Sequence, residues 1–227
     1  MKKYRMLKSI FIVAFFSFFF TQVKCQDKQE DKINAATQVL KDFGEMKESI
    51  PDELLEVAQG IIIVPKLINA GFVLGGKRGK GIAMVKLEDG SWSQPVFVTI
   101  TGGSIGFQAG IQSIDLVLIF KKRETLQQLG RGSFTLGGDI SATAGPVGRN
   151  STASTDYKME AEVYSYSRSK GLFAGISLSG SAIDVDQKSN EAFYGKSIDS
   201  ETLFTTPVDN DAKSVTQLVE ALDSFYN

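Results

Sequence analysis

The sequence predicts an α+β domain in which a strongly curved antiparallel β-sheet or barrel is covered by short α-helices. Residues 71–120 support the sheet, because they alternate short apolar runs with glycines and keep no helical period. Amphipathic helical patterns flank that stretch at residues 32–45 and 211–225. With 227 residues and no Pro/Ser-rich linker, the chain is expected to form one sizeable core.

Residues 1–25 form a separate segment. Basic residues at positions 2–8 precede an apolar run at 10–20, and Val23 and Cys25 suit a cleavage site. We therefore predict a signal peptide at 1–25, a domain at 26–227, and export to the periplasm or outer envelope. An uncleaved anchor stays open, although the run is shorter than the roughly 20 residues of a spanning helix. A lipoprotein anchor at Cys25 ranks second, because Lys24 is a poor neighbour for it.

Composition excludes several classes of function. Removing residues 1–25 lowers the basic side chains from 25 to 20, against 26 acidic ones, so nonspecific nucleic-acid binding is not expected. The chain has no histidine and one cysteine, which excludes Ser-His-Asp and Cys-His catalysis, histidine-containing zinc sites and an internal disulfide. We expect that the protein is not an enzyme and that it binds no metal ion and no cofactor. An enzyme that uses carboxylate or Ser-Lys chemistry stays open as a third interpretation.

The first helix is expected at residues 32–45, where one apolar stripe recurs at helical spacing. Its members are Ile33, Ala36, Leu40 and Phe43. Packing of the stripe on the sheet is favoured, because a sheet needs a cover on one face. A membrane-lying amphipathic helix is the alternative.

A second helix is expected at 52–59, opened by Pro51 and stopped by Gly60, followed by a strand at 61–64 and a helical turn at 65–70. Hairpin turns are then predicted at 76–79, at Asp89-Gly90 and at Gly102-Gly103. Glycines inside strands mark bends, bulges or close backbone approach. The residues so interpreted are Gly102, Gly103, Gly106 and Gly110.

Residues 116–120 are continuously apolar, which predicts a central strand buried on both faces. The rest of the chain is expected to alternate short elements. These are a helix at 123–129, a strand at 133–144, a hairpin at 160–168 and 172–185, and helices at 186–194 and 211–225.

An ordered succession of motifs runs from about residue 34 to the C-terminus. It comprises IIIVPKLINAGFVLGGKRGKG, GSWSQPVFVTITGGSIGFQAG, DLVLIF, FTLGGDISATAGPVGR, YSYSRSKGLFAGISLSG and NEAFYG. This succession resembles the SYLF domain family, which is related to the actin-binding domain of yeast SH3-containing actin-patch proteins. The resemblance implies a lipid-binding module, which in eukaryotic relatives sits beside SH3 or FYVE domains and can bind actin.

Combining the resemblance with the predicted export, we expect a noncatalytic phospholipid-binding module of the bacterial cell envelope. Its expected partner is a phospholipid or membrane surface, and actin is not expected because the domain would lie outside the cytoplasm. The alternative is an envelope structural or protein-interaction module without a lipid ligand.

The candidate headgroup site is the basic cluster Lys77, Arg78 and Lys80. Glycines on both sides predict an exposed hairpin tip that projects the three cations together. Near an anionic surface such a cluster attracts phospholipid headgroups. An ordinary solvated turn is the alternative.

Asp115 lies inside the apolar run IQSIDLVLIF. Burial of an unpaired carboxylate would cost several kcal/mol, so we expect it to reach a rim or a base. Arg149 and Arg168 are the candidate partners, and a structural ion pair is favoured over catalysis.

The predicted export has a direct test. If residues 1–25 are a cleaved signal peptide, the exported protein begins at Gln26, and intact mass spectrometry of that form shows it. Retention of Met1, or a diacylglyceryl mass on Cys25, would contradict this prediction.

Overall fold

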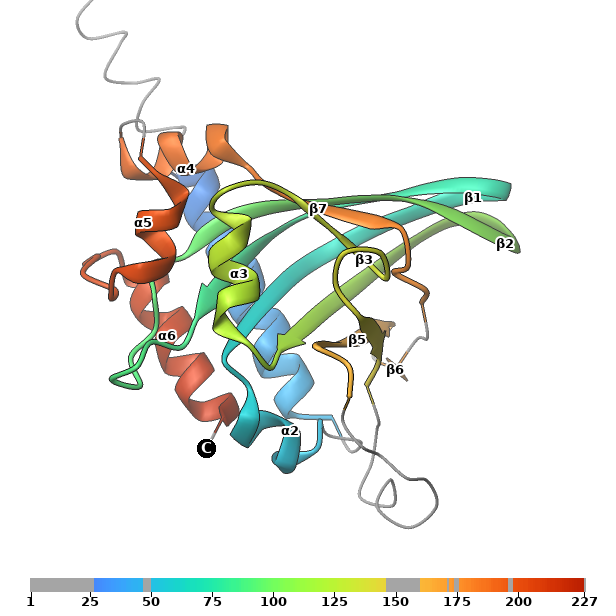
Figure 1. Ribbon diagram of the computed structural model, residues 1–227. Coiled ribbons are helices and arrows are strands. Elements are labelled where there is room, and N and C mark those ends of the chain that lie inside the picture. The colour runs from blue at the N-terminus through green and yellow to red at the C-terminus, as the bar shows by residue number, and fades with distance from the viewer. Residues whose placement is uncertain are drawn as a thin grey trace, which may run out of the picture.

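A computed structural model describes residues 27–46, 50–145, 160–170, 172–173, 176–195 and 198–226 (Figure 1). Short helices surround a seven-stranded sheet of order β3-β7-β2-β5-β4, with β1 paired to β2 and β6 to β5. The sheet is mixed and strongly curved, which confirms the predicted α+β class. The predicted signal peptide and Arg149 lie outside the described residues.

The helices comprise residues 27–44, α2 (Asp52–Val57), α3 (Arg123–Leu129), α4 (Gln187–Tyr194), α5 (Ser200–Thr205) and α6 (Lys213–Tyr226). The strands are β1 (Gly60–Val85), β2 (Val96–Phe120), β3 (Phe134–Leu136), β4 (Ala142–Ala144), β5 (Val163–Ser169), β6 (Leu172–Phe173) and β7 (Ser181–Val185).

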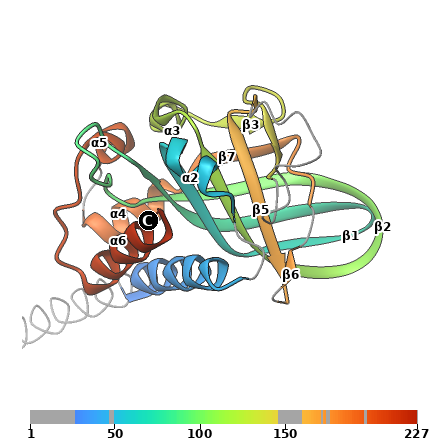
Figure 2. The ribbon, with the colours of Figure 1, turned by 90° about the horizontal axis from the view of Figure 1, so that it is seen from below.

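A long ribbon of β1 and β2 dominates the molecule. The two strands pair antiparallel from Gly60 with Phe120 to Ala83 with Val96. The predicted Asp89-Gly90 turn joins them, and Gly90 has a φ of 84° there. The ribbon curves back on itself at its far end (Figure 2). Its register shifts between Val64 and Leu67 and between Gly71 and Val73.

The other two predicted hairpin turns are wrong, because Gly76 and Lys77 pair with Gly103 and Gly102 inside the ribbon. Residues 65–70 are also part of β1 instead of a helical turn. The glycines of the ribbon lie within continuous, curved strands. Of the four glycines predicted to mark bends, bulges or close backbone approach, two are confirmed. Gly110 has a φ of 138°, and a Cβ on Gly102 would lie 2.7 Å from Ser181 Oγ.

The curvature brings the two halves of β1 against each other. A Cβ on Gly81 would lie 2.4 Å from the Ile63 carbonyl oxygen and 2.8 Å from Val64 Cγ2. A Cβ on Gly79 would lie 2.5 Å from Val64 Cγ1. These separations are below any normal contact, so the close crossing of the two halves requires glycine at both positions.

Two hydrophobic cores lie on opposite faces of the ribbon. Ile61 and Ile63 enter a core beneath residues 27–44, α2 and α6, whereas Ile62 and Val64 enter a core with α3 and α5. Figure 2 shows residues 27–44 and α6 on one side and α3 and α5 on the other. Residues 116–120 pair with both β1 and β5, so they form the predicted central strand.

The helices expected near α3, α4 and α6 are confirmed, while α5 was not predicted from the sequence. Gly60 begins β1 instead of stopping the second helix. The expected strand at 133–144 is divided into β3 and β4, and β4 pairs in parallel with β5.

The predicted hairpin of residues 160–168 and 172–185 forms only as the short pairing of β5 with β6. Its second half, β7, instead pairs with β2 and β3, because the edge of β2 is free to accept it at residues 98–101. Within the described part of the chain, no helix is long and apolar enough to cross a membrane.

The close crossing in β1 predicts unequal effects of two glycine substitutions. Gly81→Ala should destabilise the fold by about 3 kcal/mol, because the added methyl group meets backbone that cannot move independently. Gly103→Ala is the matched control, since no atom lies within 4 Å of its added Cβ. Chemical denaturation measures both, and equal stability of the two variants would contradict the crossing.

Candidate functional site

The helix of residues 27–44 lies across one face of the curved sheet. Its predicted apolar stripe, Ile33, Ala36, Leu40 and Phe43, is fully buried in the core beneath it. The stripe therefore packs on the sheet, as the favoured interpretation expected. This helix also forms one wall of the candidate site.

Arg168 of β5 anchors the C-terminal end of that helix. Its guanidinium donates to Asp115 Oδ2 at 2.8 Å and to Asp42 of the helix, and it lies 5.7 Å from the centre of the Phe43 ring. The structure thus contains the expected pair of Asp115 with Arg168 and adds Asp42. Burial raises the pKa of Asp42, but hydrogen bonds from Gln38 and Arg168 and the charge of Arg168 hold it below its usual value.

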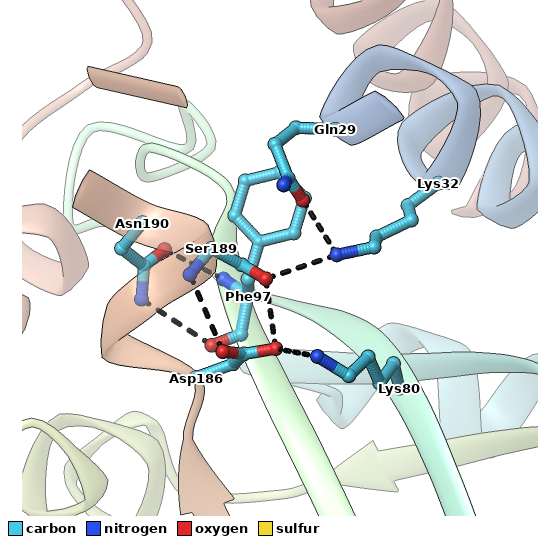
Figure 3. A network of polar contacts seen from close by, with 7 residues as sticks. All are labelled: Gln29, Lys32, Lys80, Phe97, Asp186, Ser189 and Asn190. Carbon is cyan, nitrogen blue, oxygen red and sulfur yellow. Dashed lines mark hydrogen bonds and ion pairs between the residues drawn. The ribbon is translucent and has the colours of Figure 1, made fainter. Parts of the chain in front are cut away.

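A polar network anchors the N-terminal end of the same helix (Figure 3). Lys32 Nζ donates to Ser189 Oγ at 2.9 Å, and Ser189 Oγ donates to Asp186 Oδ2 at 2.7 Å. Lys80 Nζ of β1 reaches the same Asp186 oxygen at 2.5 Å. The network joins the helix, β1 and α4 through these four side chains.

Asp186 has two structural tasks in this network. Its carboxylate caps α4 by accepting from the Ser189 N–H at 3.2 Å, and it neutralises Lys80. Burial raises the pKa of Asp186, but hydrogen bonds from Lys80 and Ser189 and the charge of Lys80 outweigh it, so the pKa is lowered. Because the Ser189 hydroxyl donates to Asp186 and accepts from Lys32, it links α4 to the helix of residues 27–44.

Asn190 fixes α4 to the sheet by a second route. Its amide oxygen accepts from the Phe97 N–H at 2.9 Å, and its Nδ2 donates to the Phe97 carbonyl at 3.3 Å. The Lys32 ammonium lies 5.5 Å from the centre of the Phe97 ring. The helix of residues 27–44 is therefore held over β2 as well as over α4.

Beside the N-terminal anchor, the helix and β1 form an open pocket of about 490 Å³. We call this the basic pocket. It is lined by Lys28, Asp31, Lys32 and Ala35 of the helix and by Pro65, Lys66, Arg78, Gly79 and Lys80 of β1. Five cations and one carboxylate thus line the pocket, and a second carboxylate, Asp186, pairs with Lys80. The excess of cations attracts anionic groups.

The pocket corrects the expected hairpin tip. Arg78 and Lys80 line it, but Lys77 points to the other face of β1, because successive side chains of a strand alternate. Lys77 is buried and donates to the Ser177 carbonyl. Burial lowers the pKa of its amino group. The three cations therefore do not project together, and Lys77 is not part of the pocket surface.

Sequence reasoning missed Lys28, Lys32 and Lys66 as site residues. The first two are four positions apart in a helix, which places them on one face, outside the apolar stripe. That spacing was a usable signal. No sequence signal indicates Lys66, because its position depends on the register shift between Val64 and Leu67. Lys66 has a φ of 52° within that shift.

Charge distinguishes the lining of the pocket, which holds five basic side chains. Within the described part of the chain, no group of histidine, cysteine, aspartate or glutamate side chains could hold a metal ion. The arrangement is suited to binding an anionic group reversibly.

Comparison with known proteins identifies the family. A family model described as "Ysc84: Las17-binding protein actin regulator" matches residues 101–225. The chain belongs to the Ysc84 family. This confirms the resemblance to the SYLF domain. Among its relatives, "LAS seventeen-binding protein 3" of Saccharomyces cerevisiae is 35% identical over 176 residues, which are 76% of this chain and 38% of that protein.

Animal and other fungal relatives are similarly close. "SH3 domain-containing YSC84-like protein 1" of Homo sapiens is 34% identical over 197 residues, 84% of this chain and 57% of that protein. "SH3 domain-containing protein PJ696.02" of Schizosaccharomyces pombe is 38% identical over 165 residues, 71% of this chain and 38% of that protein. This Ysc84-family chain therefore spans 38% to 57% of the length of these three relatives.

These names correct the expected partner. The family description and the yeast relative refer to binding of Las17 and to regulation of actin, and both are protein partners. The expectation that the partner is a phospholipid or membrane surface, with actin unlikely, is therefore wrong. The lipid expectation rested on the family resemblance and on the basic cluster of residues 77–80, whereas the doubt about actin rested on the predicted export.

The Arg168 anchor predicts a specific instability. Arg168→Met should destabilise the protein by about 3 kcal/mol, because it leaves Asp42 and Asp115 close together without a cation. Asp42→Asn is the control and should cost only about 1 kcal/mol, since Arg168 keeps Asp115.

The same anchor predicts a pH dependence. The pKa of Asp42 is lower in the folded state than in the unfolded state, where it is about 4. The stabilisation that ionised Asp42 gives the fold is therefore complete above the unfolded pKa and is lost as the pH falls through the folded pKa. Urea denaturation at several pH values should therefore show the difference between parent and Arg168→Met shrinking below about pH 4. A difference independent of pH would contradict the assignment.

Proposed function

We propose that this chain is a noncatalytic binding domain whose basic pocket recognises an acidic segment of a partner protein. The charge of the pocket carries the proposal. Its lining holds five cations and one carboxylate, and cations remain in excess although Asp186 neutralises Lys80, on a chain whose acidic side chains outnumber its basic ones. A basic pocket on a chain of net negative charge favours binding of an anionic group at the pocket over nonspecific binding of anions across the surface.

Three of the five cations are available to a ligand. Lys28, Lys66 and Arg78 are exposed, and none forms an ion pair with an acidic side chain of the described residues. Lys32 and Lys80 are held by the network on Ser189 and Asp186 and fix the pocket floor. The floor of the pocket is thus held in place by hydrogen bonds, and exposed cations surround its opening.

The names of the relatives supply the first partner class to test. They refer to a Las17-binding protein and an actin regulator, so proteins of actin assembly are the natural candidates. The family description is that of a binding and regulatory domain, which supports the noncatalytic part of the proposal. A protein-interaction role was the alternative reading of the sequence.

The place of action is a separate proposal. The basic start and apolar run of residues 1–25 support export, and an exported domain would meet its acidic partner in the periplasm or outer envelope. The basic pocket can bind an acidic protein surface, actin-like or other, in any of these compartments.

Removal of two rim cations should weaken binding to an acidic protein. Lys66→Asn with Arg78→Gln deletes two pocket charges, and asparagine tolerates the left-handed backbone at position 66. We expect about tenfold weaker binding to purified actin filaments in co-sedimentation, and to polyglutamate by fluorescence titration. Added salt should weaken binding by the parent more than binding by the variant.

The control is Lys122→Asn with Arg131→Gln. It removes the same two charges from exposed positions outside the pocket, where Lys122 pairs with Glu162 and Arg131 with Glu201. Its binding should equal that of the parent. The same proteins are sedimented with vesicles of phosphatidylcholine and phosphatidylserine. Binding to these vesicles alone, with no affinity for actin filaments or polyglutamate, would overturn the proposal in favour of a lipid ligand.

A further inference from the structure

The distal half of the ribbon, residues 67–76 and 102–113, contains no charged side chain. Its strands pair with each other from Leu67 with Ile114 to Gly76 with Gly103. Among the described residues, β7 pairs with β2 only at 98–101 and β5 only at 115–120. The distal ribbon therefore projects beyond the other elements, as Figure 1 shows.

Two large apolar side chains are exposed on one face of this projection. Ile68 pairs with Ser113 and Ala70 with Ile111, and both pairs lie on the same face because side chains two residues apart point the same way. Ile68 is 42% exposed and Ile111 is 77% exposed. They are diagonal neighbours, which in antiparallel sheets lie about 7–8 Å apart. We call the four residues Ile68, Ala70, Ile111 and Ser113 the distal shelf.

The distal shelf is continuous with the basic pocket. Lys66 lines the pocket and lies two residues before Ile68 in β1. Asp115, which follows Ser113 by two residues, is bound to Arg168 and to the Lys66 N–H, so it does not separate the two surfaces by a free charge. A cationic surface thus leads directly into an uncharged apolar one.

We propose that the basic pocket and the distal shelf form one docking surface for a protein segment in which acidic residues are followed closely by apolar residues. This inference rests on the proposed function and specifies the sequence of the ligand. At about 3.3 Å per residue, an extended segment with its acids at Lys66 and Arg78 places its apolar side chains on the shelf two to four residues further along. Charge complementarity fixes which end of the segment meets the pocket.

Two synthetic peptides test the inference. One carries a run of glutamates followed after two residues by a pair of leucines, and the other replaces the leucines by serines. The parent protein should bind the glutamate-leucine peptide about tenfold more tightly, because burial of an aliphatic side chain contributes on that scale. Fluorescence anisotropy at constant salt measures both affinities.

Ile68→Thr with Ile111→Thr removes the apolar shelf and keeps the β-branched preference for strands. The variant should lose the tenfold advantage and retain the parent affinity for the glutamate-serine peptide. Val57→Thr is the control, because Val57 is 44% exposed on α2 outside both surfaces. It should preserve the advantage, and thermal melts establish that all three proteins are folded.

The outcomes separate the two proposals. If the shelf variant keeps the full advantage, or if the parent never shows it, the shelf takes no part and this inference is overturned while the pocket proposal stands. If the parent binds neither peptide, the pocket proposal itself fails. Sedimentation velocity adds one further outcome: a dimer of the parent that the shelf variant abolishes would reassign the shelf to self-association.

Discussion

The close crossing of β1 over itself is the constraint on which the rest of this structure depends. Gly79 and Gly81 allow the second half of the strand to approach the backbone of Ile63 and the side chain of Val64. The crossing sets the curvature of the whole ribbon. It also brings Pro65 and Lys66 from one half of β1 beside Arg78 and Lys80 from the other half. Both strand-derived sides of the basic pocket therefore come from a single strand.

The helix of residues 27–44 completes the pocket because both of its ends are anchored by charge. Arg168 holds Asp42 and Asp115 at one end, and Lys32 and Lys80 converge on Ser189 and Asp186 at the other. The apolar stripe between these anchors supplies most of the burial. The apolar contacts of the stripe are non-directional, whereas the polar contacts at its two ends join specific pairs of atoms.

Local sequence signals predicted the elements that local interactions determine. The Asp89-Gly90 turn, α3 and the capped α4 were all recoverable, because their caps and turns lie within a few residues of each other. The candidate site was only half recoverable. The charges of Arg78 and Lys80 indicate the site, but the same pattern includes Lys77, because the flanking glycines predict a turn where the strand continues. Strand alternation decides the direction of each lysine, and only the long-range pairing with β2 establishes that residues 76–80 are a strand.

The hydrogen bond from Lys32 to Ser189 joins positions 157 residues apart. During synthesis the N-terminal helix emerges first, and its anchor on α4 cannot form until Ser189 has been added. Pairing of β1 with β2 is a nested hairpin that closes progressively from its turn, so it needs no such delay. A chain that ends before α4 therefore lacks the contact that holds Lys32 at the edge of the basic pocket.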